Sequence, residues 1–191
     1  MGKAASKIIV NLVTTTYNVN KYLEITLKDE NGHPIIFAPL IINFIDTPQI
    51  FLTNLKGQFK INVATLPPNT YSTIIIYLGT DDFKGSTITV PVTIKKANPK
   101  ITAKSAKFQV KVKNKYYKAL FKDNKNKVLK NNKVTLKVNG KTYTTKTNSK
   151  GQGIFKITNL KKKGTYTTII TIPANKYYNK VTKTVKISVN S

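Results

Sequence analysis

Hydrophobic residues alternate with polar ones over much of the chain, and three segments show the pattern clearly. Their apolar members are Phe108, Val110 and Val112, then Val134, Leu136 and Val138, and then Val185, Ile187 and Val189. Lysine, threonine, glutamine or serine occupies the positions between them. A period of two residues is typical of antiparallel strands with one buried and one solvated face. No segment shows a convincing helical period, so the pattern predicts an all-β protein.

Turn residues separate the predicted strands at intervals of about 8–12 residues. Asn139-Gly140 lies between two such strands and is the strongest short hairpin signal. Lys150-Gly151 marks another turn. Tyr71 and Tyr166 each begin a strand directly after a turn. We therefore expect each tyrosine hydroxyl to fold back onto the upstream backbone, as in the tyrosine corner of sandwich domains.

The second half of the chain repeats the first. Leu23–Asp29 aligns with Tyr117–Asp123, and Gly57-Gln58 aligns with Gly151-Gln152, at a spacing of about 94 residues. This spacing is the size of one Ig-type domain. The repeat predicts two tandem Ig-like antiparallel β-sandwiches of about seven strands each. We place the first domain at residues 1–97 and the second at residues 98–191.

The two halves differ sharply in charge. The chain has a net charge of +26, and all 33 basic residues are lysine. Residues 1–99 hold nine lysines and six acidic residues, for a net charge of +3, whereas residues 100–191 hold 24 lysines and one acidic residue, for a net charge of +23. Because self-repulsion destabilises such a domain, an anionic partner is a reasonable hypothesis. A solvated basic face, or lysine-rich composition of the genome, would also explain the charge.

The candidate contact residues lie in the second domain. Lys133 and Lys137 share the outward face of one predicted strand, and an Asn-Gly hairpin segment that does not reappear in the first domain adds Lys141 and Tyr143. The loop before the next long strand carries three consecutive lysines, Lys161, Lys162 and Lys163. We expect these seven residues to form a patch for an anionic cell-wall polymer, a polysaccharide, or the surface of a host or neighbouring cell.

Non-specific electrostatic binding of nucleic acid is the alternative reading of the charge, because phosphate attraction needs only positive charge. The absence of arginine counts against sequence-specific reading, which relies on bidentate arginine contacts. No recognisable motif supplies an aromatic stacking platform. Nucleic acid is therefore the weaker expectation.

The residues needed for catalysis or for a cofactor do not gather in any recognisable motif. The chain has no cysteine and a single histidine, His33, in the turn Asn31-Gly32-His33-Pro34. Asp29 and Asp123 occupy matching turns, where a side chain that accepts a nearby N–H explains them best. Glu24 alternates with apolar neighbours, which places it on the outer face of a strand. We expect no enzyme activity, no metal and no cofactor, and no segment has the roughly 20 apolar residues of a membrane helix.

Several segments carry a resemblance to a known family. They are "LKDENGHP" from Leu27, "TYSTIII" from Thr70 and "VTLKVNGKTYTTKTNSKGQGIFKITNLKKKGTYT" from Val134. Together they resemble the tandem Ig-like repeats of bacterial surface proteins and, above all, of the adhesin-like surface proteins of methanogenic archaea. The resemblance runs from about Lys7 to Val189.

This resemblance implies an extracellular, cell-surface location and a stalk or adhesive role without catalysis. It also implies that the chain is part of a larger secreted or wall-anchored protein with neighbouring Ig-like repeats. The family shares a scaffold rather than a ligand, so the resemblance names no specific partner.

Overall fold

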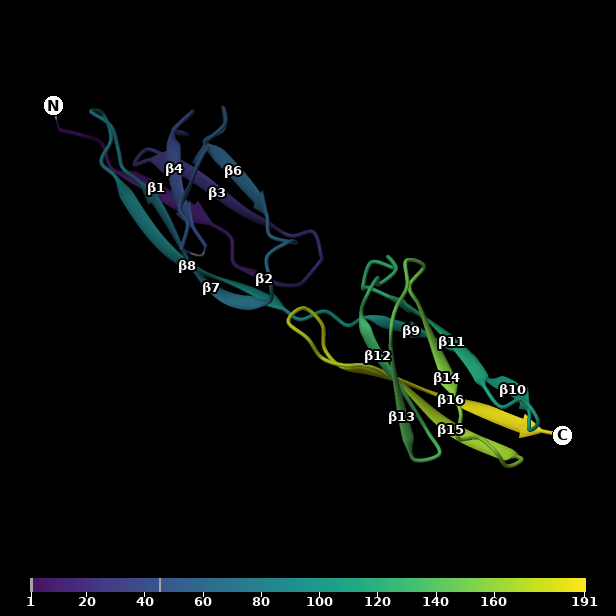
Figure 1. Cartoon of the computed structure of the whole chain (residues 1–191). Helices are drawn as coiled ribbons and strands as arrows, with labels where there is room; N and C mark the ends of the chain where they lie inside the picture. The colour runs from purple at the N-terminus through teal and green to yellow at the C-terminus, as the bar shows by residue number, and fades with distance from the viewer. Residues whose placement is uncertain (1, 45) are drawn as a thin grey trace. The chain divides into compact units, whose positions relative to one another are not determined.

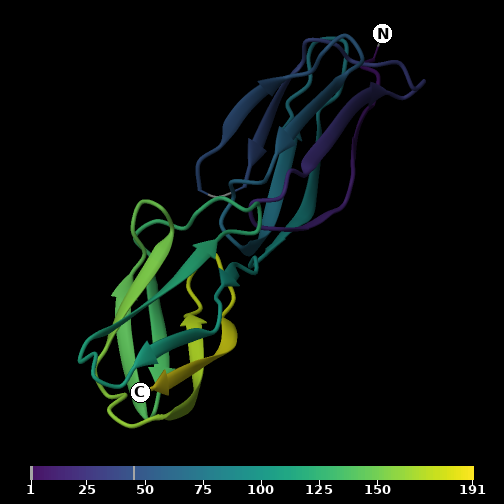
Figure 2. The ribbon, with the colours of Figure 1, turned by 90° about the vertical axis from the view of Figure 1, so that its right-hand side faces the viewer.

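The computed structural model describes residues 2–44 and 46–191. They form two compact units, the first ending at Lys95 and the second running from Lys96 to Ser191. Each unit contains one three-stranded and one five-stranded sheet, which face each other as two layers (Figure 1, Figure 2). All regular elements in the described part of the chain are strands, and none is a helix long and apolar enough to span a membrane. The prediction of an all-β pair of Ig-like sandwiches is confirmed.

The first unit has the sheet orders β1-β3-β6 and β2-β8-β7-β4-β5. Its strands are β1 (Ser6–Val10), β2 (Val13–Thr16), β3 (Tyr22–Asp29), β4 (Pro39–Asn43), β5 (Gln49–Leu52), β6 (Gln58–Asn62), β7 (Asn69–Tyr77) and β8 (Ser86–Lys95).

The second unit repeats this arrangement with the sheet orders β14-β11-β9 and β10-β16-β15-β12-β13. Its strands are β9 (Lys100–Thr102), β10 (Ala106–Gln109), β11 (Lys115–Lys122), β12 (Lys133–Val138), β13 (Lys141–Lys146), β14 (Gln152–Ile157), β15 (Gly164–Ile172) and β16 (Val181–Asn190). Ala97, which the sequence analysis assigned to the first domain, donates its N–H to the Tyr177 carbonyl and accepts the N–H of Asn179, so its backbone pairs within the second unit.

The first strand of each unit is divided between the two sheets. β1 pairs antiparallel with β3, whereas β2 pairs in parallel with β8. At the break, Oδ1 of Asn11 accepts the Glu24 N–H at 2.7 Å, and Nδ2 of Asn11 donates to the Tyr22 carbonyl at 3.1 Å. A side chain thus continues the ladder while the backbone crosses to the other sheet. This division makes eight strands out of the predicted seven or so.

The alternating residues form the two cores. The apolar positions of β12 and β16 are buried as predicted, and so are their counterparts in β4 and β8. β10 is shorter than predicted, because the Val112 N–H closes a turn onto the Gln109 carbonyl at 3.1 Å. Lys111 therefore lies in a turn.

The two cores distribute their bulk differently. β3 and β6 place Ile25 opposite Phe59, whereas β11 and β14 place Ala119 opposite Gly153. A Cβ atom at position 153 would lie 2.8 Å from the ring of Phe121, which is fully buried. The ring of Phe59 on β6 therefore fills this part of the core in the first unit, and the ring of Phe121 on β11 fills it in the second.

Both tyrosine corners are present. The Tyr71 hydroxyl donates to the Pro67 carbonyl at 2.5 Å, and the Tyr166 hydroxyl donates to the Lys162 carbonyl at 2.6 Å. Each bond fixes the turn that leads into a long strand, β7 or β15.

Candidate functional site

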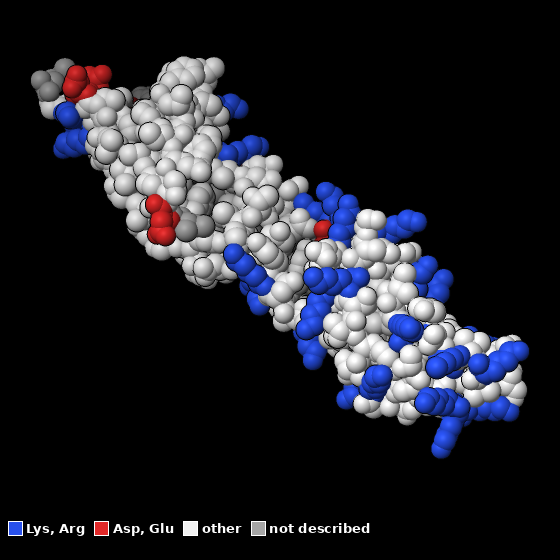
Figure 3. Space-filling model, in the orientation of Figure 1, with Lys and Arg blue, Asp and Glu red and all other residues white. Residues whose placement is uncertain are grey.

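The outer face of the five-stranded sheet in the second unit carries a basic surface with no acidic side chain. Its strands present five lysines, which are Lys107, Lys133, Lys137, Lys146 and Lys186. Between them lie threonines, including Thr135 and Thr144 of facing strands. We call these five lysines and their threonine neighbours the basic face. Lysine clusters over the second unit in the space-filling view, while much of the first unit is uncharged (Figure 3).

Two features of the basic face bear on its electrostatics. Lys133 lies directly opposite Lys146 across the β12–β13 ladder, and like charges at such positions are destabilising. Lys186 donates to the Thr167 hydroxyl at 2.6 Å, and this uncharged partner leaves the positive charge of Lys186 uncompensated. The one acidic residue of this unit, Asp123, accepts the backbone N–H groups of Lys125 and Lys127 in a turn. The repulsion on the basic face is thus uncompensated by any carboxylate of its own sheet.

The hairpin of the second unit is tied down at its turn. Asn139 and Gly140 have φ values of 48° and 78°, as a two-residue type I′ turn requires. Nδ2 of Asn159 donates to the carbonyls of Val138 and Asn139, both at 3.1 Å, and Nδ2 of Asn139 donates back to the Asn159 carbonyl at 3.1 Å. The turn is therefore held against the loop that follows β14.

Tyr143 belongs to the same network. Its hydroxyl donates to Oδ1 of Asn159 at 2.7 Å and accepts the N–H groups of Thr158 and Asn159 at 3.1 and 3.2 Å. Nζ of Lys141 lies 4.9 Å from the centre of the Tyr143 ring. Partial burial opposes ionisation of the phenol, but the hydrogen bonds with Thr158, the charge of Lys141 and the N–H of Asn159 outweigh it and lower the pKa of Tyr143.

The structure brings together only part of the predicted patch. Lys133 and Lys137 lie on the basic face, with exposed side chains. Lys141 and Tyr143 lie on the other side of β13, because they pair with the inward-facing positions Val138 and Leu136. Tyr143 acts as a brace for the hairpin.

The remaining predicted lysines, Lys161, Lys162 and Lys163, are exposed in the loop that follows Asn159. The bonds of Asn159 place this loop next to the hairpin turn. The predicted patch did not include three lysines of the basic face, Lys107, Lys146 and Lys186, or the brace residue Asn159. A usable signal existed: Tyr143 and Asn159 stand where the first unit has Gln49 and Thr65, so the two positions differ together.

On the same sheet face of the first unit, the part formed by β4, β5 and β7 is largely apolar. Ile50, Leu52 and Leu78 are 69%, 59% and 76% exposed. At its centre Ile41 lies opposite Ile50 on one side and Ile76 on the other. The equivalent positions of the second unit are all threonines, Thr135, Thr144 and Thr171. The β4–β5–β7 part of this face is thus aliphatic in the first unit, whereas the matching part of the second unit carries lysine and threonine.

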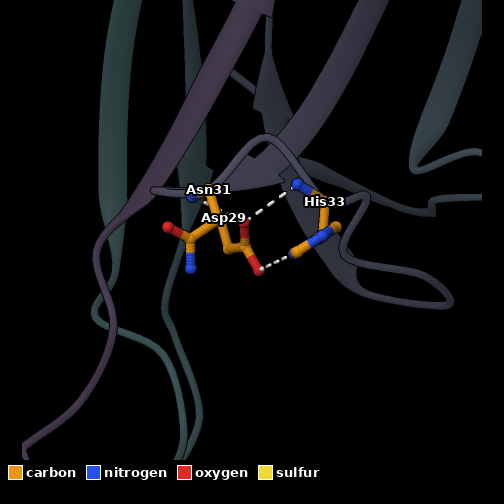
Figure 4. Close-up of polar contacts among 3 residues, drawn as sticks. All are labelled: Asp29, Asn31 and His33. Carbon is orange, nitrogen blue, oxygen red and sulfur yellow. Dashed lines mark hydrogen bonds and ion pairs between the residues drawn. The ribbon is translucent and has the colours of Figure 1, made fainter.

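Asp29 and His33 form a structural turn (Figure 4). Oδ1 of Asp29 accepts the N–H groups of Asn31 and His33, both at 2.9 Å, and Oδ2 lies 3.4 Å from Nδ1 of His33. The backbone bond from His33 lowers the pKa of Asp29; slight desolvation opposes it, and the bond from Asn31 and the proximity of the imidazole add to the lowering. Across residues 2–44 and 46–191, no three His, Asp or Glu side chains gather as metal ligands.

Replacing Asp29 by Asn is expected to destabilise the first unit at neutral pH, with a loss that fades in acid. Because folding lowers the pKa of Asp29, its ionised form contributes stability above the unfolded value of about 3.9. That contribution is lost as the pH falls through the folded pKa. Urea unfolding between about pH 7 and pH 2 measures the difference, with Asp81→Asn in an exposed loop as the control. If the difference in the free energy of unfolding between wild type and Asp29→Asn stays constant down to about pH 2, the Asp29 carboxylate does not have this role.

Comparison with known proteins shows the fold. No protein-family model and no curated protein sequence matches the chain. Among solved structures it is similar to invasin, a bacterial integrin-binding protein, with a TM-score of 0.55 at 13% identity, over 97% of this chain and 39% of that one. A tetra-tandem repeat from the extending region of a large adhesion protein matches with a TM-score of 0.51 at 13% identity, over 97% of this chain and 49% of that one. The chain thus spans less than half the length of either.

Proposed function

We propose that the chain is a non-catalytic, cell-surface module of a larger adhesin-like protein, in which tandem Ig-like units form a stalk or adhesive segment. The support is the pair of sandwiches built on one repeated scaffold and the similarity of their fold to invasin and to the tandem repeat of a large adhesion protein. An extracellular location and neighbouring Ig-like repeats, of the methanogen type suggested by the sequence, belong to the same proposal.

The proposed partner of the second unit is an anionic polymer, such as a cell-wall polymer or an acidic polysaccharide. The observation that carries this proposal is the basic face, because the same scaffold in the first unit needs no such charge. Exposed ammonium groups interspersed with threonine hydroxyls suit a polymer with regularly spaced carboxylates. The hydroxyls of Thr135 and Thr144 add hydrogen bonds that a bare charge cluster lacks.

Removing four lysines of the basic face is expected to weaken retention of the full chain on an immobilised polyuronate. The variant replaces Lys133, Lys137, Lys146 and Lys186 by Gln, and it should elute at clearly lower salt, because fewer counterions are released on binding. A control variant replaces four lysines that lie off this face, Lys118, Lys125, Lys156 and Lys180, and has the same net charge. The readout is the salt concentration at elution.

The results distinguish specific binding by the basic face from generic polycation behaviour and from nucleic-acid binding. Weaker retention of the basic-face variant alone supports binding through the basic face. Equal loss in both variants means generic polycation behaviour and contradicts the proposal. Tighter retention on double-stranded DNA than on polyuronate at the same salt would instead favour nucleic acid.

A further inference from the structure

The first unit carries a groove that the basic face does not explain. Its volume is about 680 Å³, within the usual range of small-ligand sites. The floor consists of outward-facing residues of β3 and β6, with Glu24 and Thr26 on β3 and Gln58 and Lys60 on β6. The walls include Phe37 and the turn before β6, with Leu55 at its tip.

Phe37 is held in an unfavourable backbone conformation. Its φ is 50°, in the left-handed region, and its side chain is 61% exposed. A bulky residue rarely adopts this conformation, which glycine and asparagine tolerate much better. The equivalent residue of the second unit is Asn131, with a φ of 55°. The second unit therefore uses a residue suited to the position, and the first unit does not.

The scaffold imposes this conformation in both units. The Phe37 N–H donates to the Thr53 carbonyl, and the Thr53 N–H donates to the Ala38 carbonyl, both at 3.0 Å. Asn131 and Thr147 make the matching bond at 2.8 Å. Since the backbone is the same, the phenylalanine brings strain without a gain in core burial. Backbone strain of this kind concentrates at functional sites.

Two further wall residues are apolar only in the first unit. Leu55 is 70% exposed at the tip of the turn, where the second unit has Ser149. Phe59 also borders the groove, but its ring faces the core and lies 4.4 Å from that of Phe51, measured between ring centres. Phe37 and Leu55 are thus two exposed apolar side chains beside a groove whose turn is otherwise common to both units.

The floor supplies several polar side chains. No ion pair to Glu24 occurs within the described residues, although Lys60 lies opposite it. Nζ of Lys60 lies over the ring of Tyr22, at 4.8 Å from its centre. The floor therefore offers a carboxylate, an ammonium group, an amide and a hydroxyl side by side.

We propose that this groove binds a segment of a neutral oligosaccharide. A pyranose ring has an apolar C–H face, which suits the exposed Phe37 and Leu55, and hydroxyl edges, which suit Glu24, Thr26 and Gln58. The mixed charges of the floor favour a neutral ligand over an ion. A peptide strand added to the outer edge of β6, the last strand of its sheet, fits less well, because it would lie beside the groove floor, which presents side chains of the sheet face.

The test exchanges residues between the two units. Phe37→Asn in the full chain is expected to weaken binding of short gluco-, manno- or chito-oligosaccharides by about tenfold or more, measured by calorimetric titration. The same substitution should raise the Tm of the first unit by about 4 °C, because it relieves the strained backbone. The reciprocal variant Asn131→Phe should lower the Tm of the second unit and leave oligosaccharide binding unchanged. Loss of binding together with a gain in stability excludes misfolding as the cause.

Other results would overturn the proposal. They are unchanged binding in Phe37→Asn, no saturable binding of any of these oligosaccharides by the wild type, or preferential binding of extended peptides. The four-lysine variant of the basic face should bind the oligosaccharide normally. A failure of the polyuronate experiment is therefore distinguishable from a failure of this one.

Discussion

Replacing Gly57 by Ala is expected to lower the free energy of unfolding of the first unit by about 3 kcal/mol. Gly57 has a φ of 69°, and an added Cβ would lie 2.6 Å from the Leu27 carbonyl oxygen and 2.9 Å from Cβ of Pro34. The Leu27 oxygen already accepts the N–H of Ile35 at 3.0 Å. It cannot move away without loss of that bond, so both backbone strain and a steric clash contribute.

Gly32→Ala is the matched control. Gly32 has a φ of 82°, but no atom lies within 4 Å of an added Cβ. This variant carries the strain alone, about 1 kcal/mol. Urea unfolding, with hydrogen exchange of the β3 amides to report on the first unit, measures both variants. Equal losses would show that the close approach of Gly57 to Leu27 is unimportant.

Replacing Gly153 by Val is expected to destabilise the second unit by about 2–3 kcal/mol. The site is fully packed, since a Cβ would lie 2.8 Å from the Phe121 ring and 3.0 Å from Cγ2 of Val134. The first unit solves the same problem with a smaller residue on β3, because Leu27 stands where the second unit has Phe121. Phe121→Leu should therefore make room for the valine.

A double-mutant cycle tests this coupling. Phe121→Leu alone leaves a cavity and is destabilising, but Gly153→Val should cost much less in that background. We expect an interaction energy of about 1–2 kcal/mol in favour of the double variant. Additive losses would mean that the Phe121 ring and residue 153 do not compete for one space.

Period-two alternation and the turn residues were enough to predict the sandwiches, because each strand buries one face and that buried face fixes its pairing register. The tyrosine corners were predictable because Tyr71 and Tyr166 follow turns at matching places. The division of the first strand was not, since it depends on Asn11 reaching the backbone of Tyr22 and Glu24 across the sheet. No local pattern encodes that contact.

The candidate surfaces were only partly predictable. Alternation placed Lys133 and Lys137 correctly on the outer face, because their neighbours are buried. It could not show that Tyr143 bonds Asn159, which lies on a loop between the two sheets. The groove beside Phe37 was also hidden, because only the fold brings Phe37 and β3 next to β6 and the turn before it. The repeat did allow equivalent positions of the two units to be compared. The difference between Phe37 and Asn131 can be interpreted only once the left-handed backbone conformation at both positions is known.

The parallel pairing of the terminal strands has a mechanical consequence. In each unit the second segment of the divided first strand lies beside the exit strand and runs in the same direction, as β2 runs with β8 and β10 with β16. Tension applied at both ends of a unit pulls these two neighbours in opposite directions along their axes. Their hydrogen bonds are then sheared together instead of being unzipped one after another, so extension is resisted by the whole ladder at once.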